Sequence, residues 1–131
     1  QLHLKVSQFV CLMIFGIGCD IVDVKRVQSI IDKYNDKFLN RIFTDQEINL
    51  SKSTNNSFYY AKRFSAKEAY AKATGYGIGK KVSFKDIEIL NDKNGAPYFN
   101  KHPLQNKNIK AFLSISDEIQ YAISYVVLER I

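Results

Sequence analysis

The chain has 131 residues, of which 46% are apolar, 13% aromatic and 24% charged. This composition excludes an intrinsically disordered chain, and the length suits a single domain with one core. The formal net charge of +6 favours an acidic partner, which could be nucleic acid, an anionic membrane surface, a phosphorylated cofactor or an acidic protein. With only two cysteines, Cys11 and Cys19, a disulfide framework is excluded, and we expect free, buried thiols in a reducing compartment.

The start of the chain allows two interpretations. Its only methionine is Met13, so we expect residues 1–12 to be an upstream extension and residues 13–131 to form the domain. The apolar run 9–19 could instead be the core of a signal peptide, although no small-x-small cleavage pattern follows it. Because the run is too short to span a bilayer, we expect a cytoplasmic protein without a membrane segment.

The first predicted elements are a strand and two helices. Residues 13–20 form a short apolar run typical of a buried strand, in which Gly16 and Gly18 indicate close approach of another backbone. Asp23 is a candidate N-cap for a helix whose apolar residues recur at three-and-four spacing. These residues are Val24, Val27, Ile31, Tyr34 and Phe38. The sequence TDQE at 44–47 is a capping-box pattern and predicts a second, shorter helix.

The longest predicted helix covers residues 58–74, follows the polar connection 51–57 and ends at Gly75 as its C-terminal cap. A second capping-box pattern, SAKE at 65–68, allows the helix to begin there instead. Glu68 and Lys72 lie on one face of this helix in either case. They are either an exposed pair that stabilises the helix or a functional carboxylate and amine.

The remainder of the chain has the period of strands. Residues 82–90 and 96–100 flank a turn that contains Asn94 and Gly95, a strong signal for a hairpin. Residues 109–116 and 120–129 predict two more strands joined at Asp117 and Glu118. The order of elements predicts an α+β fold, in which a largely antiparallel sheet packs with one long and one or two shorter helices.

The glycine-rich segment after the long helix, GYGIGKK, matches no standard phosphate-binding motif. A dinucleotide fingerprint needs a strand before the glycines and a helix after them, and a Walker motif needs Ser or Thr where Lys81 stands. The glycines form either a cap and a turn, or a set of backbone amides that receive phosphate oxygens beside Lys72, Lys80 and Lys81. Asp20, at the end of the first predicted strand, is compatible with a hard cation such as Mg²⁺, whereas Asp23 is better used as a cap.

Five blocks of sequence carry a resemblance to a known family. They are MIFGIGCDIVDVKR, RIFTDQE, RFSAKEAYAKATGYGIG with FKDIEI after it, NGAPY, and LSIS. In this order they resemble the holo-acyl-carrier-protein synthases, the small bacterial-type 4′-phosphopantetheinyl transferases. The resemblance extends from Met13 to Glu129 and implies the fold of that family.

The resemblance also implies an activity. Family members use Mg²⁺ to move the phosphopantetheine arm of coenzyme A onto a serine of an acidic apo-acyl carrier protein, for fatty acid biosynthesis, and release adenosine 3′,5′-bisphosphate. Asp20 and Glu68 match the two metal ligands, and Lys72 matches a lysine that meets the phosphates. Glu68 or a metal-bound water is the candidate base for the serine proton. The resemblance further implies a homotrimer with sites between protomers, and neither nucleic acid nor membrane as a partner.

The remaining site residues are implied by the same resemblance. Arg26 matches an arginine that contacts the carrier protein. The residues that fall in the matching coenzyme A-binding region are Arg63, Lys67, Lys72, Gly75, Gly77, Gly79, Asn94, Gly95 and Pro97.

Two positions depart from the family pattern, and two other functions stay open. Asp117 stands where the family commonly has His, and its charge is unfavourable near phosphates unless it turns away or is screened by lysines. Tyr76 stands where a small hydroxylated residue is usual.

A basic nucleic-acid-binding module is suggested by the charge and the tyrosines at 59, 60, 70 and 76, although their helical spacing beside alanines is typical of a packing face. A non-catalytic interaction protein on the same fold is suggested by Asp117.

Overall fold

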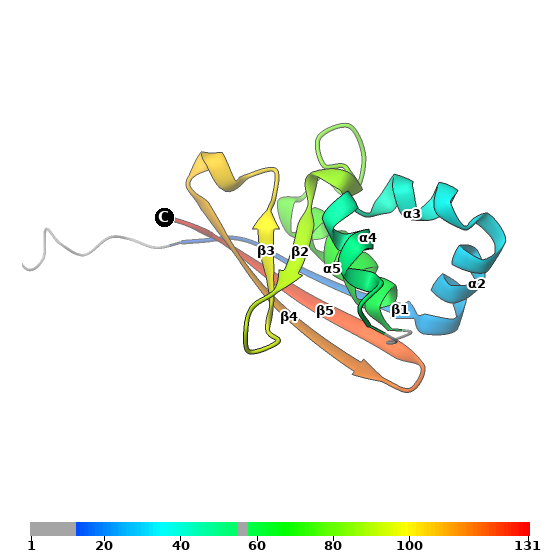
Figure 1. Cartoon of the computed structure of the whole chain (residues 1–131). Coiled ribbons are helices and arrows are strands. Elements are labelled where there is room, and N and C mark those ends of the chain that lie inside the picture. The colour runs from blue at the N-terminus through cyan, green and yellow to red at the C-terminus, as the bar shows by residue number, and fades with distance from the viewer. Residues whose placement is uncertain (1–12, 55–57) are drawn as a thin grey trace, which may run out of the picture.

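A computed structural model of the chain describes residues 13–54 and 58–131 (Figure 1). The predicted extension 1–12, which includes Cys11, and residues 55–57 of the polar connection lie outside the described residues. None of the helices in the described part is long and apolar enough to cross a membrane.

The main sheet has three antiparallel strands in the order β1 (Met13–Asp23), β5 (Tyr121–Arg130) and β4 (Ile109–Glu118). The long helix α5 (Tyr59–Thr74) packs against this sheet, chiefly on β1 and β5 (Figure 1). A separate antiparallel hairpin is formed by β2 (Glu88–Asn91) and β3 (Pro97–Lys101), with Gly95 in its turn at a φ of 84°. The predicted α+β fold, its antiparallel pairing and the hairpin are confirmed.

Three shorter helices, α2 (Val24–Tyr34), α3 (Asp36–Ile42) and α4 (Asp45–Ser51), connect β1 to the start of α5, so the structure has more helices than predicted. The single helix expected after Asp23 is broken at Asn35, whose φ of 50° lies in the left-handed region that Asn tolerates. The side chain of Asp23 accepts hydrogen bonds from the backbone of the first turn of α2, which confirms it as the N-cap. The capping box of Thr44 and Glu47 at the start of α4 is confirmed as well.

Several predicted boundaries are wrong. The turn between β4 and β5 lies at Ile119 and Gln120, because Glu118 still pairs with Tyr121 in the ladder. Ser65 lies inside α5 and its hydroxyl contacts that of Ser124, so the helix does not begin at 65. A short 3₁₀ helix, η1 (Phe84–Asp86), replaces the first part of the strand expected over 82–90, and η2 (Gln105–Lys107) precedes β4.

The first strand is half exposed rather than buried. Its residues alternate between a face that packs on α5, such as Val22 at 3% exposure, and an outer face on which Ile17 and Ile21 are 65% and 59% exposed. Cys19 lies on this outer face and is exposed, which corrects the expectation of a buried thiol. The outer face of the sheet is therefore apolar and uncovered in a single chain.

Close contact between β1 and α5 depends on two glycines. An added Cβ would lie 1.8 Å from the carbonyl oxygen of Ala73 at Gly16, and 1.8 Å from that of Ala69 at Gly18. Both distances are far inside van der Waals contact, so the predicted close backbone approach is confirmed. Because side chains alternate along a strand, Asp20 lies on the same face as the two glycines and is directed toward α5.

Replacement of Gly18 by alanine is expected to destabilise the protein by about 1–3 kcal/mol or more, because β1 or α5 must move to admit the methyl group. Urea unfolding measures this as a lower midpoint with an unchanged slope. Gly79→Ala is the matched control, since nothing lies within 4 Å of its added Cβ and its φ is not positive. Equal midpoints for the two variants would contradict the close contact.

Candidate functional site

Asp20, Glu68 and Lys72 form a cluster where β1 crosses α5. The Lys72 ammonium donates to Asp20 Oδ1 at 3.0 Å and to the Cys19 carbonyl oxygen at 3.0 Å. The ion pair of Lys72 is thus with Asp20, 52 residues away, rather than the helical pair with Glu68 that the spacing also allowed. Two of the three ammonium hydrogens are used by these contacts, which leaves one for an incoming anion.

The negative charge of Asp20 acts on Glu68 within the cluster. The pKa of Glu68 is raised, first by its partial burial and then by the negative charge of Asp20, while the positive charge of Lys72 opposes both effects. The pKa of Lys72 is raised chiefly by its hydrogen bond to Asp20. Like charges that face one another repel, so this pair of carboxylates would be stabilised by a cation between them.

A further observation suits a cation at this point. Asp20 Oδ2 is buried and has no hydrogen-bond partner among the residues that the structure describes. A buried carboxylate oxygen without a donor is costly, and a metal ion would satisfy it. Within the same residues, no group of three or more His, Cys, Asp or Glu side chains gathers as a metal site. The protein would therefore supply two carboxylates, which suits Mg²⁺ with further ligands from phosphate and water.

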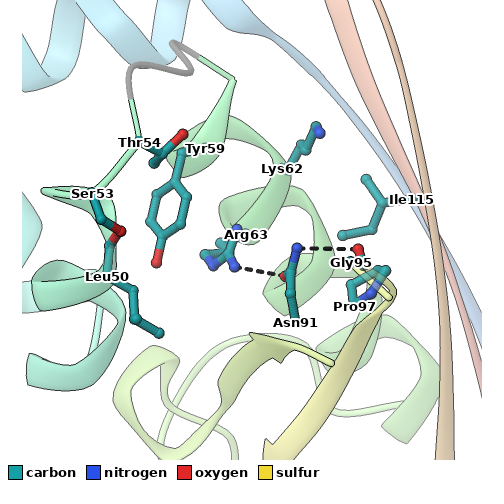
Figure 2. Close-up of a pocket in the computed structure, with 10 residues that line it drawn as sticks. All are labelled: Leu50, Ser53, Thr54, Tyr59, Lys62, Arg63, Asn91, Gly95, Pro97 and Ile115. Carbon is teal, nitrogen blue, oxygen red and sulfur yellow. Dashed lines mark hydrogen bonds between the residues drawn. The ribbon is translucent and has the colours of Figure 1, made fainter. Parts of the chain in front are cut away.

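A cavity of about 410 Å³ lies between α4, α5 and the β2–β3 hairpin (Figure 2). Its lining residues are Leu50, Ser53, Thr54, Tyr59, Lys62, Arg63, Asn91, Gly95, Pro97 and Ile115. Three of the predicted coenzyme A-binding residues, Arg63, Gly95 and Pro97, are therefore brought together here. Asn94 lies in the exposed hairpin turn and is not part of the lining, and Asn91 is there in its place.

The guanidinium of Arg63 is held in this cavity by three groups. Its Nε donates to the Ile89 carbonyl oxygen at 3.3 Å, and a terminal nitrogen donates to Asn91 Oδ1 at 2.9 Å. The guanidinium also lies over the ring of Tyr59 at 3.8 Å from its centroid. Asn91 in turn donates to the Gly95 carbonyl oxygen, so Arg63 is tied to the hairpin turn (Figure 2).

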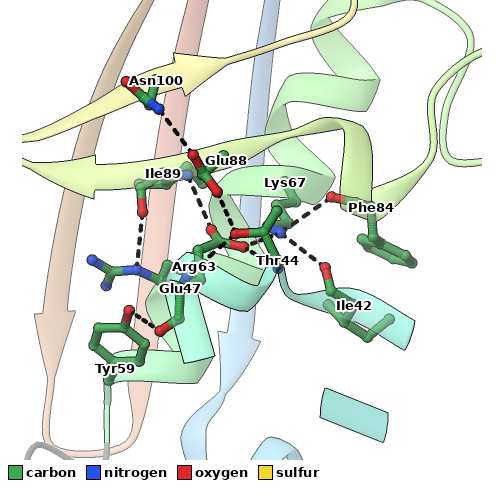
Figure 3. A network of polar contacts seen from close by, with 10 residues as sticks. All are labelled: Ile42, Thr44, Glu47, Tyr59, Arg63, Lys67, Phe84, Glu88, Ile89 and Asn100. Carbon is green, nitrogen blue, oxygen red and sulfur yellow. Dashed lines mark hydrogen bonds and ion pairs between the residues drawn. The ribbon is translucent and has the colours of Figure 1, made fainter. Parts of the chain in front are cut away.

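Lys67 does not reach this cavity, and its predicted contact with coenzyme A is corrected. Its side chain is fully buried, and its three ammonium hydrogens go to Glu47 Oε1 at 2.6 Å and to the carbonyl oxygens of Ile42 and Phe84 at 2.8 and 3.1 Å (Figure 3). Burial lowers the pKa of Lys67, and the charge of Glu47 opposes this effect. Lys67 is a structural partner of Glu47, and no donor remains for a ligand.

Glu47 makes more contacts than its capping-box pattern predicts. Besides its capping-box bond, its Oε1 accepts from Lys67 and its Oε2 accepts from the Ile89 amide at 3.0 Å. Its carbonyl oxygen accepts from the Tyr59 hydroxyl. One fully buried carboxylate thus joins α4, α5 and β2, which are walls of the cavity (Figure 3). A capping box predicts only the helix start, so no sequence signal for the long-range contacts was present.

The glycine-rich segment does not form a cradle of amides. The backbone amides of Gly75, Gly77 and Gly79 donate to carbonyl oxygens of Lys72, Ala71 and Val82. Of the two alternatives for these glycines, the cap and turn describes this arrangement, because their amides already donate to internal carbonyl oxygens. Gly75 and Gly77 have positive φ, as a left-handed cap and turn require.

The remaining predicted positions lie at the surface. Arg26 is exposed on α2. The Lys81 ammonium lies over the ring of Tyr76, 4.4 Å from its centroid, in the turn after α5. Asp117 forms an ion pair with Lys62 at 3.8 Å, and screening by a lysine is one of the two conditions under which its charge is tolerable near phosphates.

The cavity and the carboxylate cluster lie on different sides of α5. Arg63 and Glu68 are five residues apart, and at about 100° per residue their side chains leave the helix about 140° apart. Asp20, Glu68 and Lys72 are absent from the cavity lining. One chain therefore presents the cavity and the carboxylate cluster on separate sides of α5.

Comparison with known proteins identifies the class. Residues 16–126 match the model of the 4′-phosphopantetheinyl transferase superfamily, and the chain belongs to this family. A holo-[acyl-carrier-protein] synthase of Vesicomyosocius okutanii is 48% identical over 89% of this chain and 98% of its own length.

Solved structures give the same result. The holo-[acyl-carrier-protein] synthase of Neisseria meningitidis has a TM-score of 0.82 at 41% identity and covers 88% of this chain and 98% of its own. That of Helicobacter pylori in complex with coenzyme A has a TM-score of 0.78 at 36% identity, with 86% and 98% covered. The resemblance to the holo-acyl-carrier-protein synthases is confirmed, and the fold is that of these enzymes.

Removal of one partner of the buried ion pair is expected to cost about 3–5 kcal/mol, because the other charge stays buried without compensation. Lys67→Met should therefore lower the free energy of unfolding in urea by that amount. The double variant Glu47→Gln, Lys67→Met removes both charges and should cost less than Lys67→Met alone. Lys85→Met, at an exposed lysine, is the control. A double variant less stable than Lys67→Met would contradict the pairing.

Proposed function

We propose that this chain transfers the 4′-phosphopantetheine arm of coenzyme A to a serine of apo-acyl carrier protein and releases adenosine 3′,5′-bisphosphate. The observation that carries the proposal is the convergence of Asp20, Glu68 and Lys72 around an unpaired, buried carboxylate oxygen. Membership of the transferase family gives this cluster its chemistry. The product, holo-acyl carrier protein, would serve fatty acid biosynthesis in the cytoplasm.

Asp20 and Glu68 are the residues that would hold Mg²⁺. When bound, the ion would neutralise the charge that develops on the diphosphate during transfer. Lys72, fixed by Asp20 and the Cys19 carbonyl oxygen, has a remaining hydrogen for a phosphate oxygen. The raised pKa of Glu68 suits a group that takes the serine proton.

Arg63 is the proposed anchor for coenzyme A. It is positively charged, fixed at the cavity wall, and lines the cavity together with Gly95 and Pro97. A planar guanidinium pairs well with a phosphate group. The basic turn of Lys80 and Lys81 would add attraction at long range.

We further propose a homotrimer in which the cavity of one protomer and the carboxylate cluster of its neighbour form each site. The separation of Arg63 and Glu68 around α5 supports this arrangement. Within one chain the two side chains point in different directions, so they would not face the same coenzyme A molecule. The uncovered face of the main sheet supplies a surface for assembly. Its exposed side chains include Ile17, Ile21, Phe112, Tyr121 and Tyr125.

The acidic carrier protein is assigned to the exposed face of α2. Arg26 lies there with Lys25 and Lys33, and complementary charge speeds the encounter of such partners. Asp32 on the same helix reduces the positive charge of this face. The face of α2 assigned to the carrier protein therefore has a small excess of positive charge.

Asp20→Asn and Glu68→Gln are expected to reduce transfer about 100-fold or more, because each removes a negative charge that would hold the metal ion. Mass spectrometry of apo-carrier protein incubated with coenzyme A and Mg²⁺ detects the added arm, and a chelator should prevent it. Asp45→Asn, at an exposed carboxylate on α4, is the control and should keep full activity. Absence of transfer by the wild-type chain under every metal condition would overturn the proposed function.

Mixing of two inactive variants tests the shared site. Arg63→Ala and Glu68→Gln should each be inactive alone, whereas trimers assembled from both, by mild unfolding and refolding together, should recover part of the activity. Recovery is expected because some interfaces then combine two intact halves. A site within one protomer would give no recovery.

Ile17→Lys placed in both variants provides the control for the mixing experiment, because a charge on the uncovered sheet face should prevent assembly. Ile119→Lys, at an 88% exposed residue of the β4–β5 turn, should leave recovery intact. Light scattering reports the mass of each assembly.

A further inference from the structure

The cavity at the hairpin contains two neighbouring cations that are held very differently. Arg63 is buried and fixed by the Ile89 carbonyl oxygen, the Asn91 side chain and the Tyr59 ring. Three partners from two elements leave its guanidinium little freedom to move. It is a permanent positive charge in the wall of the cavity.

Lys62 has a weaker attachment. Its ammonium lies 3.8 Å from Asp117 Oδ1, too far for a hydrogen bond, and the two side chains are 27% and 37% exposed. Exposed ion pairs of this kind contribute little to stability, and they exchange partners easily. Lys62 is thus a positive charge that can turn from one anion to another.

Lys62 and Asp117 lie where a mobile positive charge could contact a ligand in the cavity. Lys62 lines the cavity together with Arg63, and Ile115 of β4 lines it two residues before Asp117. The lining residues include these two cations and no carboxylate. Asp117 therefore stands at the rim, as a negative charge next to a positively charged interior.

We propose that Lys62 and Asp117 form an exchangeable ion pair at the rim of the cavity, in which Lys62 leaves Asp117 to bind a phosphate group of the nucleotide. The inference rests on the proposed function for the identity of the nucleotide as coenzyme A. A phosphate group offers the ammonium more negative charge and more acceptor oxygens than a carboxylate does. Asp117 competes with the ligand for Lys62 and repels its phosphate, so it limits the affinity.

Binding of coenzyme A to the full chain with Mg²⁺, measured by titration calorimetry without carrier protein, tests the proposal. Lys62→Met should raise the Kd about 3- to 10-fold, and Asp117→Asn should lower it about 2- to 5-fold. Both side chains are partly exposed, so thermal unfolding should be close to that of the wild type. Lys107→Met removes the same charge at an exposed residue outside the cavity lining and should leave the Kd unchanged.

Comparison with Lys107→Met distinguishes a contact at the rim of the cavity from the general electrostatic effect of removing one positive charge. A Kd for Lys62→Met equal to that of Lys107→Met, or weaker binding by Asp117→Asn, would overturn this inference and leave the proposed function standing. Absence of coenzyme A binding by the wild-type chain would overturn the proposed function and this inference with it.

Dephospho-coenzyme A identifies which phosphate Lys62 contacts. If it is the 3′-phosphate, the difference between the wild type and Lys62→Met disappears with this ligand. If it is the diphosphate, the difference remains. Either result supports the exchange and assigns its partner.

Discussion

The contact of two glycines in β1 with the backbone of α5 is the constraint on which the candidate site depends. Gly16 and Gly18 allow the strand to lie against the carbonyl oxygens of Ala73 and Ala69, closer than any side chain would permit. The next residue on that face is Asp20. Its carboxylate is thereby brought to Lys72 and Glu68, one residue before each of the two alanines. The spacing along one strand thus determines which carboxylate meets the helix.

The opposite side of α5 is fixed by charge instead of by close backbone contact. Lys67 is enclosed by Glu47 and two carbonyl oxygens, and Glu47 also binds the amide of Ile89. This network positions α4 and β2 against the helix and so forms the cavity that contains Arg63. A buried pair of this kind gives little net stability compared with apolar residues, but its geometry specifies one arrangement of the elements around it.

Much of the fold and part of the site could be predicted from the sequence, because the signals involved are local or are carried by distinctive blocks. The N-cap at Asp23, the capping box at Thr44, the cap at Gly75 and the hairpin turn at Gly95 all depend on a few neighbouring residues. Asp20, Glu68 and Arg63 came from the family resemblance. Tyr59 and Tyr70 are buried, in agreement with a packing face rather than a base-stacking surface.

The errors arose where a contact joins residues far apart in the chain. Lys67 resembles its neighbours in any local pattern, and only the buried Glu47, 20 residues earlier, shows that its charge is used in the interior. The glycines at 75, 77 and 79 look available for a ligand until their amides are traced to internal carbonyl oxygens. Asn35 is compatible with a helix by spacing, and its left-handed φ depends on how α2 and α3 pack.

The two constraints on α5 together fix its rotation about its own axis. Lys67 and Glu68 are consecutive, so a turn of the helix by about 100° would bring Glu68 to the position of Lys67. That rotation would place a carboxylate against Glu47 and the carbonyl oxygens that now accept from Lys67, and it would take Glu68 away from Asp20. The acceptors would repel the carboxylate, and Tyr70 and Thr74 would replace Ala69 and Ala73 opposite the glycines of β1. The helix has one favourable rotation about its axis, and the carboxylate proposed to bind metal is defined by that angle as much as by its place in the sequence.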